Sequence, residues 1–145
     1  MSKSDFLEAG LLNLIFNATT LTGIANNAST SPLTNLYVAL HTADPGDAGT
    51  QSTSEATYTG YARVAVARTS GGWTISGSSP TQVVPAAAIT FPACTAGSST
   101  ITYFSIGVAS SGATSILYSG AVSPSIAVTA GVTPQLTTAT TITED

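Results

Sequence analysis

From residue 35 onward the chain consists of short segments in which apolar and polar residues alternate, separated by turns rich in Gly, Pro and Ser. In residues 35–41, for example, Leu36, Val38 and Leu40 fall on one face. Comparable segments are residues 61–69, 73–76, 87–91, 101–109, 114–122, 125–129, 132–136 and 138–143. Because successive side chains of a strand point to opposite faces, the pattern predicts a mainly β fold, an antiparallel β-sandwich or jelly-roll-like barrel of about eight short strands.

One α-helix is expected before the strands, over residues 4–20. Ser4 or Asp5 can cap its start, and Gly23 is a suitable stop. Five apolar residues recur at helical spacing and predict the buried stripe: Leu7, Leu11, Leu14, Ile15 and Ala18.

No linker divides the chain, so a single domain spanning residues 1–145 is expected, with the β-sandwich over residues 35–143. Residues 42–57 contain little apolar material and include the sequence Asp44-Pro45-Gly46-Asp47. That composition predicts a long exposed loop with a turn at its Pro-Gly pair.

Charged residues are absent from residues 69–143, about half of the chain. Free monomers usually protect strand edges and surfaces with charges, whereas the cores of protein interfaces are depleted of them. Much of this half is therefore expected to lie against other subunits. The alternative is a surface solvated by Ser and Thr hydroxyls, which are abundant here.

Composition excludes several classes of function. Lys3, Arg63 and Arg68 are the only basic side chains, too few for a nucleic-acid site, which must neutralise several phosphates. No apolar run is long enough for a transmembrane helix. Because the first residues lack the features of a signal peptide, synthesis in a cytoplasm is expected.

His41, the only histidine, is followed by Asp44 and Asp47, a spacing that could offer three ligands to a metal. Both aspartates flank a Pro-Gly turn, which itself favours Asp, so a packed, hydrogen-bonded His41 is the stronger interpretation. Cys94 is the only cysteine and is expected in the core. No nucleophile motif, carboxylate pair or phosphate loop is recognisable, so no catalytic residue, cofactor or metal is predicted and the chain is not expected to be an enzyme.

Candidate interface residues fall into two groups. Tyr58, Tyr61 and Arg63 form an aromatic and cationic cluster in sequence, which could contact a sugar or a protein. The alternative is the start of a strand with one of the two tyrosines packed inward. Arg63 and Arg68 could each hold a carboxylate of a neighbouring subunit. The second group lies on the expected helix: Phe6, Leu7, Leu11 and Leu14.

Six stretches carry a resemblance to a known group of proteins. They are residues 36–46 (Leu-Tyr-Val-Ala-Leu-His-Thr-Ala-Asp-Pro-Gly) followed by residues 49–51 and 58–64, then residues 104–112 and 117–120, and finally residues 132–138. Together they resemble small structural proteins of tailed bacteriophages, some of which are described as tail-fibre proteins and others as head decoration, or cement, proteins. The joint match covers most of the chain.

The resemblance implies a virion protein. Among the alternatives we favour capsid decoration, in which the protein binds the outer surface of the icosahedral head as a dimer or trimer and clamps the major capsid protein. The small size and the absence of repeats argue against a complete fibre. A tail, baseplate or tail-fibre component and a host-carbohydrate-binding module remain as alternatives.

Overall fold

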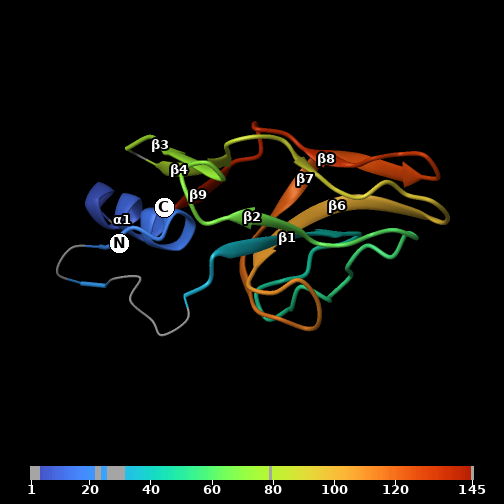
Figure 1. The fold of residues 1–145 in the computed structure, drawn as a ribbon, viewed down its shortest axis with the longest axis horizontal. Coiled ribbons are helices and arrows are strands. Elements are labelled where there is room, and N and C mark those ends of the chain that lie inside the picture. Colours follow the sequence, from blue (N-terminus) through green and yellow to red (C-terminus); the bar gives the residue numbers. More distant parts are fainter. Residues whose placement is uncertain (1–3, 22–23, 26–31, 79, 145) are drawn as a thin grey trace. The chain divides into compact units, whose positions relative to one another are not determined.

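The computed structural model describes residues 4–21, 24–25, 32–78 and 80–144, and Figure 1 shows their fold. Within these residues the chain is mainly β, with one α-helix and several antiparallel sheets. This confirms the expected fold class and is consistent with a β-sandwich. None of the described helices is long and apolar enough to cross a membrane.

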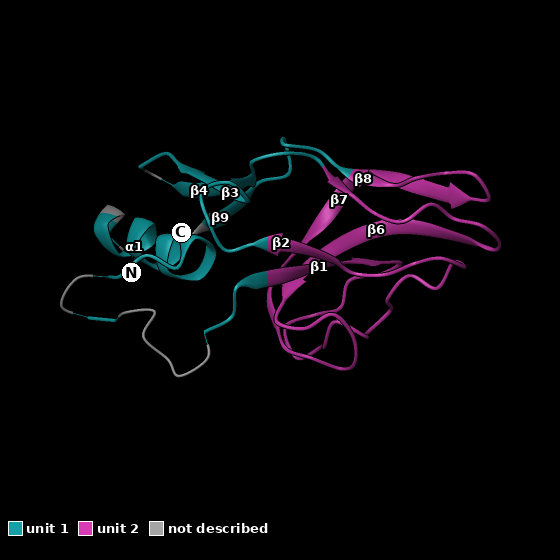
Figure 2. Ribbon diagram, viewed as in Figure 1, with its two compact units in different colours: residues 1–35, 67–88, 136–145 teal, residues 36–66, 89–135 magenta. Residues whose placement is uncertain are grey.

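The chain forms two compact units, coloured separately in Figure 2. Unit 1 consists of residues 1–35, 67–88 and 136–145, and unit 2 consists of residues 36–66 and 89–135. Each unit is built from segments that are distant in sequence. The expectation of one domain over residues 1–145 stays a prediction.

Unit 1 combines the helix with a small sheet. The helix α1 (Asp5–Asn17) packs against β3 (Trp73–Ser76) and β4 (Thr81–Pro85), and the sheet order is β3-β4-β9, with β9 at Ile142–Glu144. The strand β4 was not predicted. Its buried residues are Thr81, Val83 and Pro85, so its alternation is carried partly by residue types that do not signal a strand.

The predicted stripe of α1 is wrong. The residues that the helix buries are Glu8, Leu12 and Phe16, four residues apart, whereas Leu7, Leu11, Leu14, Ile15 and Ala18 are only half-buried. The ring of Phe16 packs edge-on against Trp73, with 4.8 Å between ring centroids. The prediction chose the helix face with the most apolar residues. The helix instead buries the face that carries Phe16 and the carboxylate of Glu8. That carboxylate, Glu8, accepts hydrogen bonds from the backbone and hydroxyl of Thr81, each 3.3 Å long.

The helix also ends earlier than residue 20. Ala18 adopts a left-handed conformation (φ 53°) and its N–H donates to the carbonyl of Asn13, which closes the last turn. The guanidinium of Arg68 donates to the carbonyls of Ile15 (2.6 Å) and Leu14 (2.7 Å). A cation at this end complements the negative pole of the helix dipole, and α1 has no basic residue in its own last turn.

Unit 2 contains a four-stranded antiparallel sheet in the order β2-β1-β6-β7, together with a two-stranded pair of β5 and β8. The bounds are β1 Asn35–His41, β2 Val64–Ala67, β5 Ile89–Thr90, β6 Ser98–Gly107, β7 Ile116–Thr129 and β8 Gln135–Leu136. The two strands predicted over residues 114–122 and 125–129 are one strand, β7, interrupted by a shift of register against β6. The apolar core of the sheet includes Val38, Leu40, Ile101, Phe104 and Ile106.

Candidate functional site

A buried polar cluster lies where residues 42–57 meet the sheet of unit 2, and Arg63 is at its centre. Arg63 is buried, with 8% of its surface exposed. Its guanidinium binds the carboxylate of Glu55 through two parallel hydrogen bonds of 2.7 and 2.8 Å. It also donates to the carbonyls of Ala109 (3.1 Å) and Gly112 (2.8 Å). One arginine therefore joins residues 42–57 to the connection between β6 and β7.

The side chains around this pair support its charge. The hydrogen bond to Glu55 raises the pKa of Arg63 above its usual value. The hydroxyl of Tyr61 donates to Glu55 Oε1 (2.9 Å) and accepts from the backbone N–H of Leu40 (3.0 Å). Burial is the main cause that raises the pKa of Tyr61, so its hydroxyl stays protonated and remains a donor.

His41 belongs to the same region and is fully buried, as the packed interpretation predicted. Its Nδ1 lies 2.8 Å from the carbonyl oxygen of Thr53, and its Nε2 lies 2.7 Å from the hydroxyl of Ser105. Since a carbonyl can only accept, Nδ1 carries the proton and Nε2 of the neutral ring accepts from Ser105. Burial lowers the pKa of His41 below 6.5.

The prediction that residues 42–57 form an exposed loop is wrong in part. Gln51 is fully buried, its Nε2 donates to the carbonyl of Tyr37 (2.9 Å), and its side chain occupies the space that a Cβ at Gly107 would need. A larger residue at position 107 would therefore require the Gln51 side chain to move. The turn at the Pro-Gly pair is confirmed, because Asp44 Oδ1 accepts from the N–H of Gly46 (2.9 Å).

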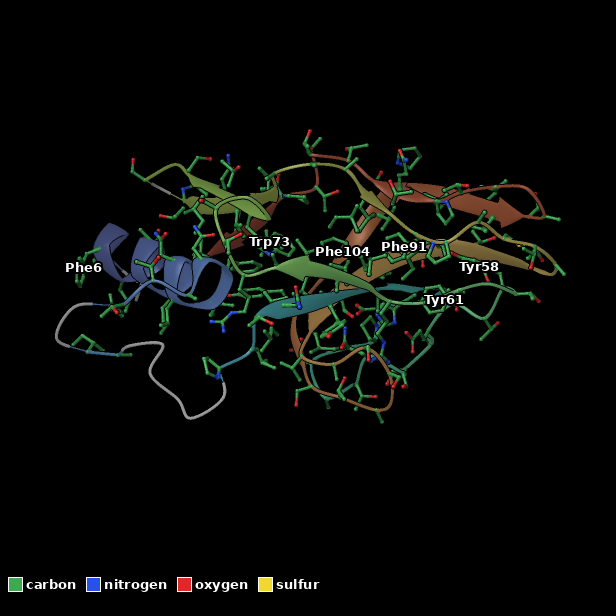
Figure 3. The ribbon with its side chains drawn as sticks, in the orientation of Figure 1. Phe6, Tyr58, Tyr61, Trp73, Phe91 and Phe104 are labelled. Atoms are coloured by element: carbon green, nitrogen blue, oxygen red, sulfur yellow. The ribbon has the colours of Figure 1, made fainter. Side chains whose placement is uncertain are left out.

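The structure brings Tyr58 and Tyr61 together inside unit 2, where both are labelled in Figure 3. Their rings are 5.4 Å apart and edge-on, and Tyr61 stacks on Phe91 at 6.5 Å. Tyr58 is 3% exposed, its hydroxyl donates to the carbonyl of Pro92 (3.0 Å), and burial raises its pKa to about 12. Tyr58 and Arg63 therefore have almost no surface to offer a partner, and Tyr58 is a tyrosine packed inward, as the alternative expected.

The remaining interface candidates lie in unit 1. Phe6 is 66% exposed, and Leu7, Leu11 and Leu14 are half-buried on the helix. Arg68 uses its guanidinium on helix carbonyls, so it acts within its own unit.

Metal ligands do not converge in the part of the chain that the structure describes, where no three His, Cys, Asp or Glu side chains come together. Both ring nitrogens of His41 are engaged by other residues, and Asp44 holds its own turn. Cys94 is buried, and its thiol donates to the carbonyl of Ala96 (3.3 Å). These polar groups are engaged within the fold.

Sequence reasoning missed a pocket beside β7. It has a volume of about 370 Å³ and is lined by Gly46 and Asp47 from the loop and by residues 116–119 of the strand. The sequence could hardly indicate this pocket, because its walls are an exposed turn and an uncharged strand that lie far apart in the chain.

Comparison with known proteins gives one informative result. A search of curated proteins finds no match. The family model described as "Podophage GP4 fiber I protein gp80" matches residues 2–143, nearly the whole chain.

Proposed function

The chain belongs to the family described as podophage GP4 fiber I protein gp80, and on this premise we propose that it is a fibre component of a bacteriophage virion. The match over residues 2–143 carries the proposal. A structural role in a phage virion follows from the family directly. The position of the protein in a fibre is the part that we propose.

This proposal replaces our preference for capsid decoration. The family description backs the tail-fibre alternative better, and it gives no support for binding to the outer surface of the head or to the major capsid protein. The earlier argument from size considered a complete fibre, whereas a small chain can be one component of a larger fibre. The proposal gives the chain a structural and not a catalytic role.

The uncharged half of the chain agrees with a role in assembly. Residues 69–143 include the two longest strands, β6 and β7, and much of the surface of β7 is exposed. Exposed strands without charges are suited to contacts between subunits. We therefore propose that the protein associates with itself and with neighbouring fibre proteins.

A phage that carries an amber codon in this gene tests the proposal. Grown on a non-suppressing host, it should yield particles with filled heads that are as heat-stable as wild-type heads but adsorb poorly to host cells. Electron micrographs of these particles should show missing or shortened fibres, and supplying the protein from a plasmid should restore adsorption.

The alternatives give different particles. A decoration protein would leave adsorption normal and make the heads burst at lower temperature. Particles with wild-type fibres, wild-type adsorption and fragile heads would overturn the fibre proposal.

A further inference from the structure

The strand β7 is the last strand of the four-stranded sheet in unit 2. It pairs with β6 along one side, and the sheet order places no strand on its other side within the described residues. A strand edge presents backbone N–H and C=O groups that can pair with another chain. Six residues at the start of β7, residues 116–121, alternate between half-buried and exposed.

The loop of residues 42–57 begins to cover this edge and then leaves it. Thr50 forms an antiparallel bridge with Ser115, and the N–H of Gln51 donates to the carbonyl of Thr114 (2.9 Å). Continued pairing would bring Asp47 opposite Tyr118. Instead, a hydrogen bond of 3.0 Å from the N–H of Gly49 to the carbonyl of Gly46 turns the loop, and the pocket beside β7 opens at this point.

The shape of the pocket shows which part of the strand it follows. Its strand wall consists of four consecutive residues, 116–119. Because successive side chains point to opposite faces, a space that touches all four lies along the edge of the strand and not on one face of the sheet. Further on, residues 122–125 fall out of register with β6 and include Pro124, which limits pairing beyond residue 121.

We propose that this edge is a docking site for an extended segment of another polypeptide, which adds one strand beside residues 116–121 of β7. In such strand addition, main-chain hydrogen bonds supply the affinity and the flanking side chains supply the specificity. The turn at residues 44–47 is held by the hydrogen bond from Gly46 to Asp44, so the wall opposite the strand is preformed.

The chemistry of the wall defines the segment. Asp47 is exposed and is the only charged residue that lines the pocket. The segment that fits is therefore extended and carries a Lys or Arg near its centre. In the described part of the chain both arginines are engaged in their own units, Arg63 with Glu55 and Arg68 with helix carbonyls, and Lys3 lies outside the described residues. The occupant that we propose is a segment of a different virion polypeptide, and a second copy of this chain is the competing outcome of the test. The inference holds wherever the protein lies in the virion.

A peptide titration of the isotope-labelled full chain, followed by NMR, tests the site. The probe is the acetylated and amidated peptide Thr-Val-Thr-Lys-Thr-Val-Thr. Its controls have Glu in place of Lys, or N-methyl groups on alternate amides that remove the donors for a strand. We expect saturable shifts of the backbone amides of residues 116–121, about two- to five-fold tighter binding of the Lys peptide than of the Glu peptide, and none of the N-methylated peptide.

Variants of Asp47 separate charge recognition from strand pairing. Asp47→Asn should make the Lys and Glu peptides bind equally, and Asp47→Lys should reverse their order. Glu144→Gln in unit 1 removes one negative charge as a matched control and should keep the preference for Lys. The proposal is overturned by shifts that leave residues 116–121 unaffected, by equal binding of the N-methylated peptide, or by sedimentation showing a dimer of this chain that the Lys peptide dissociates.

Discussion

At the scale of single residues, buried polar groups hold the loops of unit 2. Arg63 and Glu55 form a paired, hydrogen-bonded cluster, and the carbonyls of Ala109 and Gly112 accept from two further N–H groups of the guanidinium. A buried ion pair adds little net stability, but removing one partner leaves an uncompensated charge. The cluster therefore fixes loop positions more than it raises overall stability.

Arg63→Met should lower the free energy of unfolding by about 3–5 kcal/mol, because it leaves the Glu55 carboxylate without its partner. Urea denaturation followed by circular dichroism measures the loss. The double variant Arg63→Met/Glu55→Met removes both charges and should recover much of it. If the double variant loses the sum of the unfolding free energies lost by Arg63→Met and Glu55→Met alone, the two residues do not stabilise each other as a pair.

His41 makes stability depend on pH in a defined direction. Burial lowers the pKa of folded His41 below 6.5, so the unfolded chain takes up the proton first as the pH falls. The contribution of His41 should therefore be constant above about pH 7 and decline below about pH 6.5. Urea midpoints between pH 8 and pH 5 measure this, and His41→Gln, which removes the only histidine, should lose the part of the slope near pH 6. An unchanged slope in the variant would contradict this assignment.

At the scale of elements, α1 shows how a helix selects the face that it buries. Leu12 is fully buried, whereas its neighbour Leu11 belongs to the half-buried stripe that the sequence favoured. Leu12→Ala should cost about 2–5 kcal/mol of unfolding free energy, because it removes buried methyl groups and leaves a cavity. Leu11→Ala is the matched control and should cost much less. If urea denaturation shows the same loss of unfolding free energy for both variants, the face predicted from sequence is buried as well.

The packing of residues 42–57 on the sheet involves Gly107, because the Gln51 side chain lies where a Cβ of residue 107 would be. Gly107→Ala should destabilise the protein by about 1–3 kcal/mol, since the new methyl group would meet the Gln51 side chain. Gly71→Ala, where the nearest atom is the Thr69 hydroxyl oxygen at 3.6 Å, should be close to neutral. Thermal unfolding of both variants measures the difference. A neutral Gly107→Ala would mean that Gln51 can move at little cost.

The sequence predicted those elements whose pattern is local. The alternation in residues 35–41 and 73–76 gave both strands with their observed bounds, and the Asp-Pro-Gly turn needed only neighbouring residues. The partners of Arg63 could not be predicted, because Ala109 and Gly112 come from a distant connection and contribute only backbone carbonyls. The strand β4 was missed because Thr81 and Pro85 stand where apolar residues were sought.

At the scale of the whole molecule, the chain is a small, mainly β virion protein with a largely uncharged second half, and we propose that it lies in a fibre. The most direct measurement is electron microscopy of intact virions labelled with gold-conjugated antibody against the purified protein, with virions of the amber phage as the control for specificity. If the protein is a fibre component, the label should lie on the fibres and be absent from the head. Label distributed over the head would contradict it and would return the protein to the capsid surface.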